Sequence, residues 1–331
     1  MLDQLSSPLC PPGLEEAARA RRWADVGVCG DAVASVGQRV FYEGEAGGRE
    51  VTLMLTPETK VEAHHLLTPL PIAAFSHALP PTLLDAHATD RGGAVQGTVW
   101  VLPPLSLTSL QSLAGETRAR LTAAPAEWER QTCLVLLQLV TGLKHMQAQG
   151  LEETCLDLTL AARGSKLEGH DPDHRLVIAP PAEHDAPLMS LCQVAAAAAQ
   201  LFMGADDPLL RARTGSLAVP AAVPSRQAFR ALLQLLHQEK AGSLTKVKCI
   251  LELLLFGPES AGIQGKDPEE VEAVLQKWLD LERATLLHAL IRGPLEASVL
   301  TKLHLLFLVR SNTRVLREAV KFFEEPEVTE F

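Results

Sequence analysis

The sequence predicts an α+β protein with two lobes, in which one helix and a small β-rich region precede a large helical remainder. Between Val28 and Leu55, Gly-containing turn signals separate β-rich runs, which is typical of a meander of short antiparallel strands. After Pro125 the apolar residues recur near helical spacing, and Gly or Pro separates most of the later helical segments. The helices lack a constant period, so we reject a solenoid of stacked helix pairs.

The elements of the first lobe follow in order. A helix is predicted over residues 14–25, with Glu15 and Glu16 in its first turn, where the helix dipole favours anions. Strands are predicted over 33–42 and 51–55, and a stretch rich in Pro, His and Leu follows to about residue 90. Another strand is predicted over 97–102, ended by two prolines.

The second lobe opens with a helix over 127–149 that is apolar on nearly every side, as expected of the central helix of a large core. Two short apolar runs, 156–160 and 175–179, then enclose a polar loop, and a second buried helix covers 188–203. From residue 225 onward the sequence predicts only helices, over 225–238, 243–256, 268–291, 295–310 and 312–324.

Composition narrows the class of function. The 331 residues are 47% apolar, which allows a sizeable core, and a net charge of −10 argues against a broad nucleic-acid surface. No secretory signal is visible, and no apolar run approaches the roughly 20 residues that a membrane span requires. Six cysteines without a C-x-x-C pair, several of them in apolar stretches, indicate reduced thiols and a cytoplasmic location.

The order of elements around residues 143–163 resembles that of protein kinases. The segment LKHMQAQGLEETCLDLTLAAR is similar to a helix that ends before the kinase motif H-R-D-L-x-x-x-N. With the aspartate of that motif on Asp157, its His falls on Cys155, its Arg on Leu156 and its Asn on Ala162.

The same alignment predicts a site without catalytic chemistry. Met54 falls where kinases have the lysine that pairs with phosphates, and Pro180 where they have the chief metal-binding aspartate. Ala162 has no oxygen for magnesium, and no G-x-G-x-x-G loop is present. Without the lysine and the metal ligands, phosphoryl transfer by the usual mechanism is implausible, so we expect no enzyme activity and no cofactor.

Several features together resemble the PEAK family of pseudokinases, which includes pragmin. These are the D-L-x-L form of the loop at Asp157, the strand RLVIAP at 175–180, a helix before the small lobe and a long helical tail. The short form of the chain is most similar to the smallest member of that family. The resemblance implies a kinase-like fold whose flanking helices form a split helical dimerisation domain. It implies an N-terminal dimerisation segment at 1–27, a pseudokinase core at 28–220 (small lobe 28–105, large lobe 106–220) and a C-terminal helical region at 221–331.

Apolar residues on the terminal helices support a dimer interface. Segment 299–309 is apolar almost all round, and segment 268–291 has apolar stripes on two faces, one with Leu281 and one with Leu287. From sequence alone, burial inside the helical lobe explains these faces equally well, and the resemblance favours an interface. The residues predicted to form it are Leu5, Leu9, Leu14, Leu295, Val299, Leu303 and Leu306.

The resemblance implies an inactive scaffold in tyrosine-kinase and cytoskeletal signalling. It would form homodimers, or heterodimers with PEAK-family relatives, and it would recruit SH2/SH3 adaptor proteins and 14-3-3 proteins, mostly through an N-terminal extension that residues 1–12 are too short to contain. Such a protein is expected in the cytoplasm, associated with the cytoskeleton or focal adhesions. Neither nucleic acid nor a membrane span is implied.

Two other functions remain open at this point. The chain could be an atypical nucleotide-dependent transferase that uses Asp157, or a helical adaptor unrelated to kinases in which the β segment is an insertion. A metal site is not expected, because the His and Asp residues at 64–65, 170–174 and 184–185 fit no tight ligand spacing. Cys155 has no basic neighbour in sequence to activate it as a nucleophile.

Overall fold

The computed structural model describes residues 22–57, 73–84, 93–164, 174–178, 188–258, 267–292 and 299–324. The chain divides into two compact units, which are described separately below. Unit 1 comprises residues 1–113 and 153–188, and unit 2 comprises residues 114–152 and 189–331. The described elements confirm the α+β class, whereas the boundaries expected at residues 27, 105 and 220 remain predictions.

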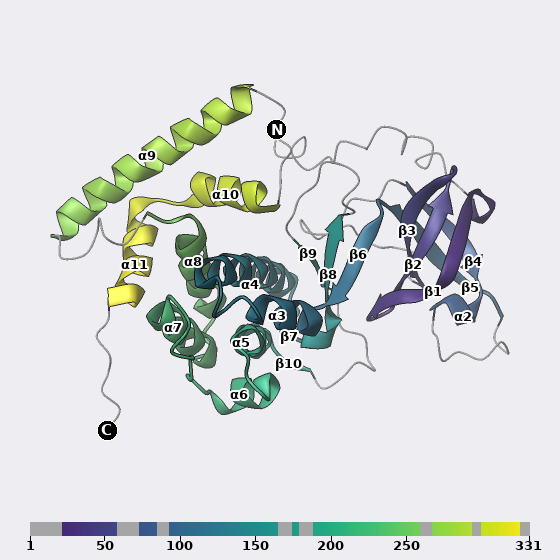
Figure 1. Cartoon of the computed structure of the whole chain (residues 1–331), viewed down its shortest axis with the longest axis horizontal. Helices are drawn as coiled ribbons and strands as arrows, with labels where there is room; N and C mark the ends of the chain where they lie inside the picture. Colours follow the sequence, from purple (N-terminus) through teal and green to yellow (C-terminus); the bar gives the residue numbers. More distant parts are fainter. Residues whose placement is uncertain are drawn as a thin grey trace. The chain divides into compact units, whose positions relative to one another are not determined.

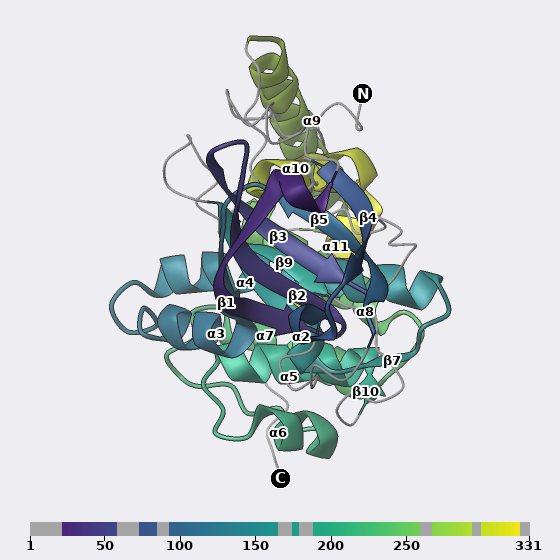
Figure 2. The same cartoon turned by 90° about the vertical axis from the view of Figure 1, so that its right-hand side faces the viewer.

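A five-stranded antiparallel sheet, in the order β1-β2-β3-β5-β4, forms most of unit 1. Figure 2 shows this sheet facing the viewer. The single strand predicted over 33–42 is wrong, because Gly37, with φ of +54°, reverses the chain between two strands. The strand β4 lies in the Pro-, His- and Leu-rich stretch, where none was expected. The strands are β1 (Val26–Val36), β2 (Arg39–Ala46), β3 (Arg49–Thr56), β4 (Ala73–Leu79) and β5 (Val95–Leu102).

Both faces of this sheet are apolar, because side chains on β2 and β3 alternate between two clusters. Val40 and Leu53 belong to one cluster, whereas Phe41 and Met54 belong to the other. The second cluster also contains residues of a three-stranded sheet in the order β6-β8-β9 and of the short 3₁₀ helix η3. These elements are β6 (Leu105–Ser109), η3 (Leu156–Leu158), β8 (Thr159–Gly164) and β9 (Arg175–Ile178), and unit 1 also contains α2 (Pro81–Leu84) and β7 (Glu153–Thr154).

Unit 2 is helical and is organised around α4 (Pro125–Ala148), which packs against α5 and α8 (Figure 1). The centre of α4 is buried on nearly every side, as its apolar run predicts. Its Trp128 contacts Phe229 of α7, with ring centroids 5.7 Å apart. The boundary between the units falls within α3 (Leu110–Arg118). The other elements are β10 (Met189–Ser190), α5 (Leu191–Phe202), α6 (Pro208–Thr214), α7 (Arg226–His237) and α8 (Ser243–Phe256).

The last three helices form a layer on α8. They are α9 (Pro268–Arg292), α10 (Val299–Arg310) and α11 (Thr313–Glu324), close to the predicted ranges. An apolar cluster that contains Leu275, Leu279 and Phe307 joins them. At the other end of the chain, the predicted helix over 14–25 is wrong at its end, because Trp23–Asp25 form a single 3₁₀ turn that leads into β1; residues 14–21 lie outside the described ranges. None of the helices in the described ranges combines the length and apolarity that a membrane span requires.

Candidate functional site

Met54, predicted in place of the phosphate-pairing lysine, lies in the middle of β3. Its Cα pairs with Phe41 on β2 and with Trp100 on β5, so an aromatic residue flanks it on each side. The residue is 3% exposed and belongs to the apolar cluster that includes Cys155 and Ala162. A charged ammonium at this position would be transferred from water into a largely apolar environment.

The residues predicted to replace the catalytic loop are contributed by η3 and β8. Cys155 precedes η3 and is buried, Leu156 is half-buried, and Asp157 is exposed. Ala162 is 1% exposed, and its Cα pairs with Leu107 on β6 and with Arg175 on β9. At the position predicted to correspond to the magnesium-binding asparagine of kinases, Ala162 therefore contributes a buried methyl group, which has no oxygen for a metal.

The structure thus brings Met54, Cys155 and Ala162 into one apolar cluster. Leu102 of β5 and Val177 of β9 complete its interior with side chains that have no charge and no hydrogen-bonding atom. This arrangement can stabilise the packing of the two sheets against each other, and it supplies neither a cation nor an oxygen ligand for magnesium. Pro180, the remaining predicted position, lies outside the described residues.

The described cysteines in unit 2 are not arranged as nucleophiles. Burial raises the pKa of the Cys192 thiol to about 11, and it raises the pKa values of Cys133 and Cys249 as well. These thiols stay protonated near neutral pH, and the thiolate is the reactive form. Among the described residues, no group of three or more His, Cys, Asp or Glu side chains could hold a metal ion. Of the His and Asp residues considered from sequence, only His174 lies in a described range.

The predicted interface residues that the structure describes all lie on α10. Val299 and Leu303 are buried within this chain, and Leu306 is half-buried. α10 packs against α8 and α9, so the protein's own helices account for part of its apolar surface. Leu5, Leu9, Leu14 and Leu295 lie outside the described residues. Their assignment to a dimer interface remains a prediction.

Sequence reasoning missed the most exposed apolar surface of the helical layer, at the C-terminal end of α9. Leu287 is 56% exposed and Ile291 is 84% exposed, and Leu281, six residues before Leu287, is also exposed. Positions 287 and 291 are four residues apart, so their side chains lie on the same side of the helix. Exposed large apolar groups at this spacing indicate an interaction surface. The signal was present in the sequence as an apolar stripe, but the pattern gave no information on which stripe the chain itself covers.

Two charged side chains on α9 fix this helix to α10 and α11. The Glu272 carboxylate contacts Arg317 of α11 at 2.9 Å and accepts a hydrogen bond from Thr313 at 3.3 Å. The Arg283 guanidinium donates to the carbonyl oxygens of Leu308 and Ser311 at the C-terminal end of α10, at 2.9 Å and 2.7 Å. A cation at a helix C-terminus satisfies carbonyl groups that lack intrahelical partners. Residues 284–292 of α9 follow both of these contacts in the sequence.

Comparison with known proteins supports the fold. No family model matches the chain, and no curated protein matches it in sequence. A crystal structure of the pseudokinase PEAK1 (Sugen Kinase 269) matches it with a TM-score of 0.62 and 16% sequence identity, covering 97% of this chain and 96% of that chain. The chain therefore has a protein-kinase-like fold, similar to that of a pseudokinase.

Proposed function

We propose that the chain is a catalytically inactive pseudokinase of the PEAK family that acts as a dimerising scaffold. The observation that supports the absence of catalysis is the burial of Met54 and Ala162 in one apolar cluster. Kinases position ATP with a lysine on its phosphates and with magnesium held by carboxylate and amide oxygens. A thioether and a methyl group cannot neutralise the charge of a triphosphate.

The exposed apolar side chains at the end of α9 support the proposal that the chain forms a dimer. Leu281, Leu287 and Ile291 expose their side chains on a helix that Glu272 and Arg283 hold in place from one side. Because Val299 and Leu303 are buried within the chain, we place the centre of the proposed dimer interface at this end of α9 instead. Burial of these side chains against a second copy would remove apolar surface from water, which favours association.

Nucleotide binding is tested by thermal unfolding of the chain with ATP and Mg²⁺. We expect the midpoint temperature to stay constant up to millimolar nucleotide, because a ligand that binds the folded state must raise it. An active protein kinase measured in the same buffers is the positive control. A magnesium-dependent rise in the midpoint would contradict the proposal and favour a transferase that uses Asp157.

Dimerisation is tested by size-exclusion chromatography with light scattering. The chain has a mass of 35.7 kDa, so the proposed homodimer has twice that mass. The double variant L287E/I291E adds two charges to the proposed interface, and we expect it to elute as a monomer. V33E is the matched control, because Val33 on β1 is 45% exposed. A double variant that keeps the mass of the unaltered chain would place the dimer interface elsewhere.

Recruitment of partners rests on the family resemblance. We propose that the dimer binds SH2/SH3 adaptor proteins and 14-3-3 proteins, pairs with PEAK-family relatives, and acts in the cytoplasm at the cytoskeleton or focal adhesions. The test is co-purification of the chain with a purified relative, and of the resulting dimer with purified adaptors. If the monomeric double variant binds adaptors as tightly as the unaltered chain does, dimerisation is not required for recruitment.

A further inference from the structure

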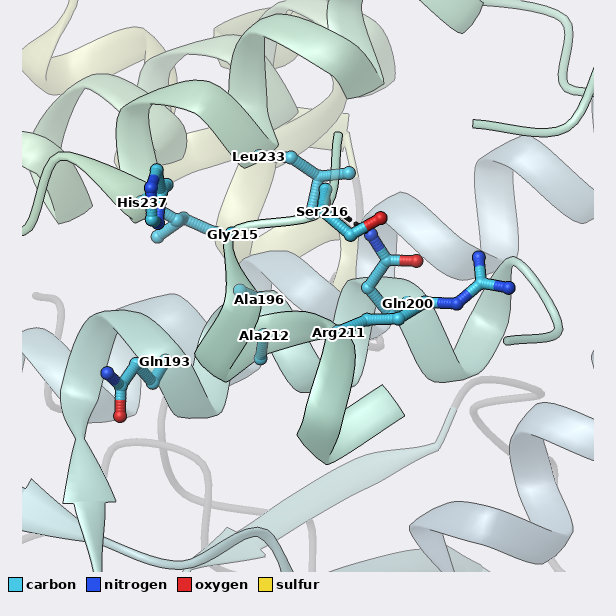
Figure 3. A pocket seen from close by; sticks show the side chains of 10 residues that line it. Gln193, Ala196, Gln200, Arg211, Ala212, Gly215, Ser216, Leu233 and His237 are labelled. Atoms are coloured by element: carbon cyan, nitrogen blue, oxygen red, sulfur yellow. Dashed lines mark hydrogen bonds between the residues drawn. The ribbon is translucent and has the colours of Figure 1, made fainter. Parts of the chain in front are cut away.

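A small pocket lies among α5, α6 and α7 in unit 2 (Figure 3). Its volume of about 10 Å³ is enough for one water molecule and far too small for a nucleotide. Gln200, one of the residues that line it, donates from Nε2 to the carbonyl oxygen of Ser216 at 3.0 Å, and its buried Oε1 has no hydrogen-bond partner among the described residues. The layer of α8, α9 and α10 offers more, because a titratable side chain lies inside an aromatic cluster there.

His304 of α10 is enclosed by aromatic rings. Its imidazole stacks on Phe256 at the end of α8, with ring centroids 4.7 Å apart and an angle of 10° between the planes. Phe307, one turn further along α10, has its ring centroid 6.4 Å from that of His304 and 5.7 Å from that of Phe256. The ring of Trp278 on α9 lies 6.2 Å from that of Phe307. The imidazole is therefore part of the packing that joins α8, α9 and α10.

The Nε2 atom of His304 faces the Glu282 carboxylate of α9. The distance between them is 3.8 Å, which is too long for a hydrogen bond. Nε2 is buried and has no hydrogen-bond partner among the described residues. Buried polar atoms are almost always paired, so an exception calls for an explanation. A proton on this nitrogen has no acceptor within hydrogen-bond distance unless the imidazole or Glu282 moves.

The other charged groups near this position are engaged elsewhere or lie on other sides of their helices. Lys248 of α8 pairs with Glu252 of the same helix. The Arg283 guanidinium of α9 lies 3.9 Å from the Asp280 carboxylate. On α10, residues 302 and 310 are two and six positions from His304, and these spacings do not place side chains on the same side of a helix.

Glu282 lies next to the contacts that hold α9 to α10. The adjacent Arg283 donates to the carbonyl oxygens of Leu308 and Ser311 at the end of α10. Leu287, the first of the two most exposed apolar residues of α9, follows Glu282 by five residues, or about 7.5 Å along the helix axis. A change in the contact between His304 and Glu282 therefore changes how the exposed end of α9 is held.

The direction of the pH effect follows from the environment of the imidazole. Burial lowers the pKa of His304, and the Glu282 carboxylate opposes this shift only in part. An imidazole released to water therefore binds a proton more readily than the enclosed one does. Acidification favours the released arrangement, beginning near the ordinary histidine pKa of about 6.5.

We propose that His304 and Glu282 form a pH-sensitive switch that regulates the exposed end of α9. With a neutral imidazole, α9 stays attached to α8 and α10 and presents Leu287 and Ile291 to a second copy of the chain. Protonation places a charge between aromatic rings, so His304 separates from Phe256, α9 loosens and the dimer weakens. This regulation rests on the proposed dimerising function, whereas the loosening of α9 takes place in the monomer as well.

The loosening is tested by hydrogen exchange of the amides of residues 282–291. The measurement uses L287E/I291E, so that association does not contribute, and compares it with the same chain carrying H304Q. Intrinsic exchange rates cancel because both chains are measured at the same pH. We expect the ratio of their exchange rates to rise about 3-fold or more between pH 7.5 and pH 5.5.

The effect on the dimer is tested by sedimentation velocity at the same two pH values. The dimer dissociation constant of the unaltered chain should rise about 3-fold or more at pH 5.5. H304F keeps an aromatic ring on Phe256 without a titratable nitrogen and should lose this pH dependence. E282Q removes the opposing carboxylate and should enlarge it. H288Q alters an exposed histidine at the end of α9 itself and is the matched control, which should keep the pH dependence.

The two measurements separate the switch from the dimer. A chain that is monomeric at both pH values would contradict the proposed dimer, and hydrogen exchange alone would then decide the switch. An exchange ratio that is equal at pH 7.5 and pH 5.5 would overturn the switch. A pH-dependent dimer that is unchanged in H304F, or that loses its pH dependence in H288Q, would overturn it as well.

Discussion

The cluster around Met54 in unit 1 and the end of α9 in unit 2 differ in where their apolar side chains lie. Around Met54, the positions predicted to correspond to charged and polar groups of a kinase are occupied by buried apolar side chains. At the end of α9, apolar side chains stand where the surface of a monomer is usually polar. The first feature underlies the proposed loss of catalysis, and the second underlies the proposed dimer interface.

The difference teaches that the proposed loss of catalysis is compatible with a well-packed core. An empty but open nucleotide site would leave unpaired polar groups, whereas Met54 and Ala162 are packed among apolar neighbours. Restoring the lysine would therefore cost stability before it could restore any activity. The end of α9 has the reverse property, because polar substitutions there should leave the fold intact.

Met54→Lys should produce the largest effect. Placing a charge at a position that is 3% exposed is expected to lower the free energy of unfolding by about 3–5 kcal/mol, measured by urea denaturation. Met54→Leu conserves the volume and should cost less than about 1.5 kcal/mol. If Met54→Lys were as stable as Met54→Leu, the cluster would be open to solvent and the contrast drawn above would fail.

Two leucines on α9 allow the buried part of this helix to be compared with its exposed part. Leu275 is fully buried, so Leu275→Ala should lower the free energy of unfolding by about 2–5 kcal/mol. Leu287→Ala should change it by no more than about 0.5 kcal/mol when the chain is dilute and monomeric. A cost for Leu287→Ala that grows with protein concentration would show that a second copy covers this residue, and would sharpen the comparison.

Arg283 should contribute an intermediate amount. Arg283→Ala removes donors to the carbonyl oxygens of Leu308 and Ser311 and is expected to cost about 1.5–3 kcal/mol, near the lower end because the side chain is partly exposed. Arg314 on α11 is the matched control, since it is exposed and contacts only Glu318 at 3.6 Å. Arg314→Ala should cost less than about 0.5 kcal/mol, and equal costs for the two variants would exclude the proposed anchoring of α9 to α10.

His304 should give the smallest effect, and only as a dependence on pH. Burial lowers the pKa of His304, which stacks on Phe256 with centroids 4.7 Å apart, although Glu282 at 3.8 Å opposes this shift. The unfolded chain therefore binds a proton more readily than the folded one. Stability should be constant above the unfolded pKa of about 6.5 and should fall as the pH drops from there through the lower folded pKa.

The measurement is the free energy of unfolding between pH 7 and pH 5, compared with His304→Gln. We expect a shallower decline in the variant. A decline of equal steepness would mean that other groups set the pH dependence and that the packing of His304 between α8 and α9 has no part in it.

The degenerate site is a prediction from the sequence. The match around Asp157 and Leu158 assigns Ala162 by counting, and the match of the strand at 51–54 to the kinase pattern V-A-I-K assigns Met54; the kinase positions to which these residues correspond stay predictions. What the alignment could not give is their shared burial, which depends on the packing of β3 against β8 and on no local pattern.

The missed elements are those whose local pattern is short. β4 alternates over only seven residues in a stretch of Pro and His, and α6 also has only seven residues. The exposed leucines of α6 do not recur at the helical spacing by which a packed helix is recognised. Gln200 could have been noticed, because a side-chain amide that follows a run of five alanines in a helix must find a partner or remain unpaired.

Apolar periodicity also could not separate the two parts of α9. Val271, Leu275 and Leu281 read as one stripe, yet the first two are buried and Leu281 is exposed. Periodicity reports that residues share a face of a helix. Whether another element covers that face at a given turn depends on where α10 and α11 end.

Tyr42 has a consequence for regulation by phosphorylation. It is the only tyrosine of the sequence, it is buried in the sheet of unit 1, and its hydroxyl donates to the carbonyl oxygen of Leu83 at 3.0 Å. A tyrosine kinase would have to open the sheet before this oxygen could act as an acceptor of phosphate. Phosphorylation of Tyr42 would therefore report that this sheet had opened.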